Sequence, residues 1–145
     1  MPRPMWFGGW PFRSRPVPFG REAEIRGARY LRSRGLLLVA CPFEGRGGEI
    51  DIVARDLDCL VFVEVKARRR DPHPEDAVTG PKRRRIIRAA NQFRHQYGAG
   101  CRYRFDILSV TLTSDGEWRF EHFPDAFGAD SPGSWARPAF GPPGP

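Results

Sequence analysis

The pattern of apolar and polar positions predicts a pair of antiparallel strands in the middle of the chain. Two apolar runs, residues 50–54 and 60–65, flank the polar segment 55–59, as expected for a hairpin with a tight turn. The second run is apolar at consecutive positions from Leu60 onward. Such a run is typical of a central strand that is covered on both faces.

Hydrophobic periodicity also predicts the elements around this hairpin. These elements are helices over residues 21–34 and 81–97, strands over residues 36–43, 103–113 and 117–123, a glycine-rich turn over 45–48 and a polar loop over 67–80. The order strand, helix, strand favours a right-handed crossover, so strand 103–113 should run parallel to strand 60–66. The predicted fold class is α/β, with a mixed sheet flanked by helices and an extra C-terminal strand.

Composition divides the chain of 145 residues into one core and two ends. Eleven of the fifteen prolines lie in residues 1–19 or 124–145. We therefore expect flexible tails over residues 1–19 and 128–145 and a single folded domain over residues 20–127. No run approaches the roughly 20 apolar residues of a membrane span, and no signal peptide is recognisable. A cytoplasmic protein without a membrane partner is expected.

Charged side chains interrupt the apolar strands of the hairpin. A four-residue turn would set Asp51 directly across from Glu64, and Lys66 would follow on the same face. Carboxylates rarely lie in a covered strand without a partner. Two acids beside a lysine therefore predict an oxygen-ligand site for a hard divalent cation. The alternative is a hairpin with cross-strand ion pairs, for instance Glu49 opposite Lys66.

The first predicted helix carries an acid on its inward stripe. This stripe, at helical spacing, consists of Glu24, Gly27, Ala28 and Leu31. A third carboxylate for a metal would explain Glu24, whereas a glutamate that turns outward or lies near the helix N-terminal dipole is the alternative. Glu22 does not share the stripe, and we expect it to pair with Arg26.

Positive charge is concentrated directly after the predicted site. The chain has a formal net charge of +7, and segment 66–94 contains ten Lys and Arg residues against three acids. The excess in this one segment equals that of the whole chain, which indicates a polyanion such as nucleic-acid phosphate. A solvated charged face is the alternative. In helix 81–97 the apolar stripe is Ile86, Ala90, Phe93 and Tyr97, and the opposite flank is Arg84, Arg88, Asn91 and His95.

An ordered series of motifs resembles a known family. The motifs are Gly20-x-x-x-Glu24, GEID at 48–51, VFVEVK at 61–66, a basic helix from Lys82, and RFD at 104–106. Together they resemble the YraN-type family of small bacterial proteins over residues 20–127. That family is grouped with the PD-(D/E)XK nuclease-like superfamily and is similar to archaeal Holliday-junction resolvases. The resemblance implies a restriction-endonuclease-like αβββαβ core. Ile50 stands where the superfamily's namesake motif has a proline.

The resemblance also implies a site and its chemistry. In such nucleases the acid of the first helix, the hairpin aspartate and the glutamate of E-x-K bind magnesium, and the lysine orients or activates the attacking water. Carried over by motif, Glu24, Asp51 and Glu64 would bind Mg²⁺ or Mn²⁺, and Lys66 would act on the water. Affinity for the nucleic-acid backbone would come from basic residues after the site, namely Arg68, Arg69, Arg70, Lys82, Arg84, Arg85 and Arg88.

The expected function is metal-dependent hydrolysis of phosphodiester bonds in DNA, including branched DNA, by an endonuclease. A junction-cutting enzyme would act as a homodimer, and the sequence leaves this open. One alternative is a non-catalytic nucleic-acid-binding protein on a nuclease scaffold. Another is an adaptor whose Pro- and Trp-rich tails bind a protein.

Two sets of polar residues are left outside the predicted site. Asp106 is excluded because pairing with Arg104 at a strand edge, or support of a turn, explains the RFD motif. The three histidines, His73, His95 and His122, lack ligand spacing.

Overall fold

A computed structural model describes residues 16–69 and 78–128 of the chain. Two helices and seven strands follow one another in this part. In chain order they are α1 (Phe19–Ser33), β1 (Leu37–Ala40), β2 (Phe43–Gly45), β3 (Gly48–Ile50), β4 (Ile52–Asp56), β5 (Cys59–Arg69), α2 (Gly80–Tyr97), β6 (Arg102–Leu112) and β7 (Trp118–Phe127).

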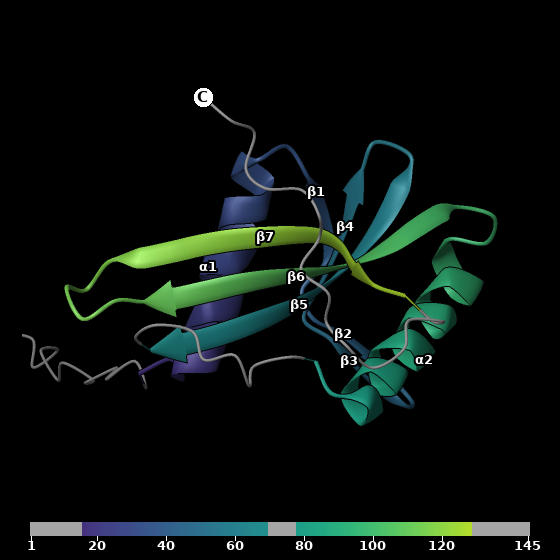
Figure 1. The fold of residues 1–145 in the computed structure, drawn as a ribbon. Helices are drawn as coiled ribbons and strands as arrows, with labels where there is room; N and C mark the ends of the chain where they lie inside the picture. The colour runs from purple at the N-terminus through teal and green to yellow at the C-terminus, as the bar shows by residue number, and fades with distance from the viewer. Residues whose placement is uncertain (1–15, 70–77, 129–145) are drawn as a thin grey trace, which may run out of the picture.

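Five of these strands form one mixed sheet, in the order β1-β4-β5-β6-β7. Strands β5 and β6 are parallel, and the other neighbours are antiparallel. Helix α2 connects β5 to β6, as the predicted crossover requires. Figure 1 shows α1 behind the sheet, and α2 beside the small hairpin of β2 and β3. The predicted α/β fold with a mixed sheet, flanking helices and a C-terminal strand is therefore confirmed.

The central strand β5 is buried on both faces. Successive side chains of a strand point to opposite faces, and Val61 and Val63 pack in the core under α1, whereas Phe62 packs in the core under α2. The α1 side also contains Ala23, Ala28, Leu31, Leu108 and Val110. The α2 side also contains Ile86, Ala89, Ala90, Phe93, Phe105 and Ile107. The predicted coverage of this strand is thus confirmed.

The structure corrects the predicted strand 36–43. The chain forms β1 up to Ala40, passes through a cis Cys41–Pro42 bond, and continues as β2 in a separate two-stranded sheet with β3. Local apolar content cannot show this break, because both halves have strand character. The glycine-rich turn 45–48 is therefore the tip of an inserted hairpin.

Other boundaries also differ from the prediction. Strand β5 continues to Arg69, because its backbone remains paired with β6 as far as Leu112, so the predicted loop 67–80 begins later. Tyr97 is 71% exposed and does not belong to the buried stripe of α2. Helix α1 begins at Phe19, one residue before the predicted start of the domain.

Some predictions concern residues outside the described ranges. The tails 1–19 and 128–145, apart from residues 16–19 and 128, fall outside them, as do Arg70, His73 and most of the loop before α2. Within the described ranges, neither helix has the length and apolar character that a membrane crossing requires.

The inserted hairpin is held against α2 by glycines. A Cβ atom on Gly48 would lie 2.7 Å from the carbonyl oxygen of Arg85, and one on Gly45 would lie 3.2 Å from the Cα atom of Ala89. Only a residue without a side chain permits these close approaches between backbones. The glycines of segment 45–48 therefore position the chain that leads into β4.

The first prediction tests this packing. Gly48→Ala should lower the free energy of unfolding by about 1–3 kcal/mol, because the Arg85 backbone cannot move aside as a flexible side chain could. Gly20→Ala is the control, since a Cβ there meets nothing within 4 Å, and its effect should stay within about 1 kcal/mol. Denaturant unfolding of both variants measures the difference. Equal stability of Gly48→Ala and the wild type would contradict the close packing.

Candidate functional site

Asp51 lies between β3 and β4, directly before the first residue of β4, and β5 continues past this point. The ladder between these strands runs from Asp56↔Cys59 to Ile52↔Val63, and its continuation sets Asp51 against Glu64, as the predicted register requires. The backbone of Asp51 bends out of the strand. Its side chain replaces a backbone partner for β5, because Val65 N–H donates a hydrogen bond to Asp51 Oδ2 at 2.8 Å.

Two further carboxylates converge on Asp51. Glu24 from α1 and Glu49 from β3 each offer an oxygen, and these oxygens and that of Asp51 all lie within 4.8 Å of one another. Glu24 was expected in the site, whereas Glu49 was missed. Glu49 is on β3, where it faces Glu44 of β2, so it is not part of the β4–β5 ladder in which the alternative placed it opposite Lys66. The sequence signal was the spacing of Glu49 and Asp51, since residues two apart share a face of an extended chain.

The negative charges in this acidic cluster, formed by Glu24, Glu49 and Asp51 with Glu64 beside them, repel one another. Burial, and then the charge of Glu64, raise the pKa of Asp51 from its ordinary 3.8 to about 8. A hydrogen bond with the Glu64 side chain and the charge of Glu24 also contribute to this rise, whereas the hydrogen bond from the Val65 N–H lowers the pKa. Two carboxylates held this close cannot both ionise at low cost. Without a metal ion, the raised pKa therefore favours the protonated form of Asp51 near neutral pH.

Two basic side chains already contact the acids. The Lys82 ammonium, from the first turn of α2, forms an ion pair with Glu64 Oε1, and Arg21 Nη1 lies 3.0 Å from Glu24 Oε2. Glu64 is only 2% exposed, whereas 48% of the Lys82 side chain is exposed. Lys82, which the sequence analysis expected to contact phosphate, forms this ion pair with Glu64 in the structure. The predicted pair of Glu22 and Arg26 forms on the outer side of α1 at 3.0 Å.

The basic residues of β5 extend from the same site. Lys66 and Arg68 follow Glu64 at alternate positions, so they share its face of the sheet. Arg68 is close enough to Lys82 to lower that lysine's pKa by charge repulsion. The Arg69 guanidinium points elsewhere and lies 4.3 Å from the centre of the Phe19 ring.

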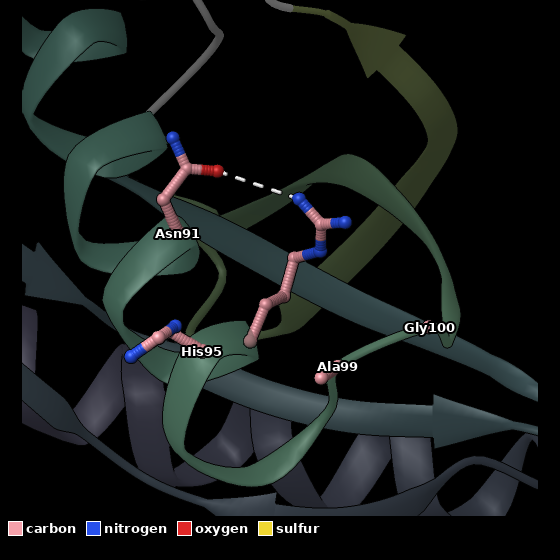
Figure 2. A pocket seen from close by; sticks show the side chains of 5 residues that line it. Asn91, His95, Ala99 and Gly100 are labelled. Atoms are coloured by element: carbon pink, nitrogen blue, oxygen red, sulfur yellow. Dashed lines mark hydrogen bonds between the residues drawn. The ribbon is translucent and has the colours of Figure 1, made fainter.

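Helix α2 carries the exposed positive charge expected from the sequence. Arg84, Arg85 and Arg88 are exposed, whereas Arg83 is buried near the Phe127 ring. At the far end of the helix a pocket of about 310 Å³ is lined by Asn91, Arg94, His95, Ala99 and Gly100. Figure 2 shows the hydrogen bond in which Arg94 donates to Asn91 Oδ1 at 3.4 Å. This pocket contains no carboxylate, so it is distinct from the acidic cluster.

Asp106 has a structural role, as the sequence suggested. It is fully buried and lies opposite Val63 in the ladder, so it points to the face of the sheet opposite Glu64. Arg104 Nε donates to it at 3.0 Å, His122 Nε2 lies 2.7 Å from it, and the Asp125 N–H of the irregular β7 donates to it at 2.8 Å. The predicted pairing with Arg104 is confirmed, and the backbone that Asp106 supports is an irregular part of β7 and not a turn.

The donor set of the cluster fits a hard divalent cation. Its ligand atoms are carboxylate oxygens from three separate elements, α1, β3 and the start of β4. Magnesium takes oxygen ligands and keeps several of its waters, so it needs only a few carboxylates. Glu64, beside Asp51, already holds the cationic Lys82, which shows that this position favours positive charge.

Known proteins resemble this chain along the segment that contains the cluster. The model of "Uncharacterised protein family UPF0102" matches residues 23–110. A UPF0102 protein of Chromohalobacter salexigens is 46% identical over 112 residues, which cover 76% of this chain and 90% of the relative. Another, of Anaeromyxobacter dehalogenans, is 42% identical over 120 residues, which cover 80% and 89%. The matched segment includes all the acids of the cluster, together with Lys66 and Lys82.

The second prediction concerns the pH dependence of stability without metal. The pKa of Asp51 is about 8 in the folded protein against an ordinary 3.8, so the folded state binds more protons than the unfolded state between these values. The free energy of unfolding should therefore fall as pH rises from about 4 to about 8, by up to ~1.4 kcal/mol per pH unit for one proton. Asp51→Asn should remove this part of the slope.

Denaturant unfolding in EDTA at several pH values measures the slope. Asp58→Asn is the matched control, because the Asp58 side chain is 75% exposed and its ion-pair partner, at 3.9 Å, is Arg102, which does not belong to the acidic cluster. This variant should keep the wild-type slope. Identical slopes for wild type and Asp51→Asn would show that Asp51 ionises normally.

Proposed function

We propose that the acidic cluster of this chain binds a divalent metal ion and hydrolyses phosphodiester bonds in nucleic acid. The chain belongs to UPF0102, the YraN-type family that its motifs resembled, and this membership is the premise of the proposal. DNA is the proposed substrate. The family assignment supports the carry-over of the motif roles to Glu24, Asp51, Glu64 and Lys66. The chemistry is argued from the site itself, since a fold alone does not specify a function.

The observation that carries the proposal is the convergence of carboxylates at the start of β4. Glu24, Glu49 and Asp51 come from three elements and bring oxygens within 4.8 Å of one another, and Glu64 adds a buried carboxylate beside Asp51. In a purely structural role this arrangement is unfavourable, because like charges repel and burial raises the cost of each charge. A divalent cation removes both penalties at once.

The side chains of the site would have separate roles in phosphodiester hydrolysis. When bound, Mg²⁺ or Mn²⁺ would supply a Lewis acid that polarises the phosphate and lowers the pKa of water. Glu24, Asp51 and Glu64 would hold the ion, and Glu49 would add a further carboxylate beside Glu24 and Asp51. Lys66, on the same face as Glu64, would place a compact positive charge beside the phosphate as negative charge develops.

The exposed basic surface supports a polyanionic substrate. Arg84, Arg85 and Arg88 lie on the helix whose first turn reaches the carboxylates through Lys82. A phosphate backbone lying along α2 would therefore extend toward the acidic cluster. Contacts of this kind contribute affinity and position without reading the sequence.

A second candidate function is nucleic-acid binding without catalysis. It is favoured by the ion pairs of Glu64 with Lys82 and of Glu24 with Arg21, because these cations partly compensate the acids without a metal. The two functions differ in one measurable property. A binding protein of this kind needs no divalent ion, whereas the nuclease loses activity when the ion is removed.

The third prediction separates metal binding from catalysis. Asp51→Asn keeps an oxygen that can accept the Val65 N–H, but it loses the negative charge, so Mn²⁺ affinity should fall more than about tenfold and cleavage should disappear. Lys66→Met should bind Mn²⁺ at least as tightly as wild type, because a nearby positive charge is removed. Its cleavage rate should fall roughly a hundredfold to a thousandfold.

Calorimetric titration with Mn²⁺ and a cleavage assay measure these effects. The assay should include single-stranded, duplex, flap and four-way DNA and the corresponding RNA, with EDTA as the metal-free control. Asp58→Asn, at an exposed position in the β4–β5 turn, should behave like wild type. If wild type binds no Mn²⁺, or if Asp51→Asn cuts as fast as wild type, the nuclease proposal is wrong and the binding function replaces it.

The fourth prediction concerns the basic face of α2. Replacing Arg84 and Arg88 together with glutamine should weaken DNA binding about equally for all sequences. It should also reduce the slope of log affinity against log salt by roughly one to two units, since each phosphate contact contributes about 0.9. The matched control replaces two exposed arginines of α1, Arg29 and Arg32, and should leave the slope unchanged. Equal slopes for both double variants would place the DNA elsewhere.

A further inference from the structure

Lys82 occupies an unusual position for a surface lysine. Its backbone lies in the first turn of α2, where Thr79 caps the helix by accepting from Lys82 N–H at 3.4 Å. Its ammonium reaches the buried Glu64, although about half of its side chain remains exposed. The backbone is therefore fixed by the helix, while the side chain has an open route to solvent.

The partners of Lys82 are the acids that would hold the metal. Burial lowers the pKa of Lys82, but the hydrogen bond and charge of Glu64, followed by the charge of Asp51, outweigh this effect and raise it. A buried carboxylate requires a compensating charge, and in the described part of the chain Lys82 supplies one for Glu64. The lysine thus supplies Glu64 with positive charge that a divalent cation would otherwise supply.

We infer that Lys82 is a displaceable internal cation, which holds Glu64 until metal and nucleic acid bind together. This inference rests on the proposed function. A divalent ion and an ammonium group on the same carboxylate repel each other, so metal binding is favoured when Lys82 leaves. A nucleic-acid phosphate gives the released ammonium a new anionic partner close to the site. The expected consequence is positive coupling between metal and nucleic acid.

The neighbours of Lys82 support release toward a phosphate. Arg68 lies near enough to Lys82 to repel it, and Arg84 and Arg85 are exposed on the next residues of the same helix. A phosphate that enters beside these groups would relieve the repulsion among the positive charges. The same anion would therefore attract Lys82 away from Glu64 and leave that carboxylate to the metal.

The test compares Mn²⁺ binding with and without a short DNA duplex, by calorimetry in wild type, Lys82→Met and Arg32→Met. Without DNA, Lys82→Met should bind Mn²⁺ about tenfold more tightly than wild type, which is within the usual range of coupling between sites. DNA should tighten Mn²⁺ binding by a similar factor in wild type and have little effect in Lys82→Met. Arg32→Met removes one exposed positive charge from α1, outside the basic face of α2, and should keep the wild-type Mn²⁺ affinity with and without DNA.

A second variant guards against loss of folding. Lys82→Gln keeps a hydrogen-bond donor for Glu64 but no charge, and it should also bind Mn²⁺ more tightly than wild type; circular dichroism identifies the folded variants. If wild type binds Mn²⁺ and the folded Lys82 variants bind it no more tightly, this inference is wrong and the proposed nuclease function stands. If wild type binds no Mn²⁺, the proposed function fails first, and this inference fails with it.

Discussion

The buried carboxylate of Glu64 in the central strand is the constraint on which the site depends. Only 2% of this side chain is exposed, and a buried carboxylate is costly unless a cation or hydrogen bonds compensate it. Lys82 provides a cation from the start of α2, whereas Asp51 adds a second acid at the same position. The fold thus concentrates negative charge at the start of β4, where acids from α1, β3 and β5 meet. A divalent cation would stabilise this arrangement more completely than the single charge of Lys82.

The inserted hairpin explains how several acids reach one point. The chain leaves the central sheet after β1, forms β2 and β3 against α2, and returns at Asp51. This detour brings Glu49 beside Asp51, and it leaves β5 beyond Val63 without β4 as a neighbour. Asp51 then binds the Val65 N–H that β4 would have paired. The close approach of Gly48 to the Arg85 backbone holds the detour in place.

The buried acids Asp106 and Glu64, on adjacent strands, have different surroundings. Asp106 receives hydrogen bonds from Arg104 and from the Asp125 N–H, and it contacts His122. These donors compensate its charge, so burial is tolerated and its role is to hold β6 to β7. Asp51 and Glu64 face each other, so each has another acid beside it, and Lys82 compensates the charge of Glu64. The distinction lies in the surrounding charges and not in the degree of burial.

The sequence by itself determined the features that depend on local periodicity. The alternation of side chains along strands predicted that Asp51 lies opposite Glu64. The helical spacing of apolar residues predicted that Arg84 and Arg88 lie on the flank opposite the apolar stripe. The path from β1 to β4 was decided by tertiary structure, because apolar content cannot show where a chain leaves one sheet to pack on a distant helix. Glu49 was therefore assigned to the wrong strand, and Lys82 was assigned to phosphate and not to Glu64. Residue patterns specify faces and local partners, whereas contacts between segments far apart in the chain decide which charges meet.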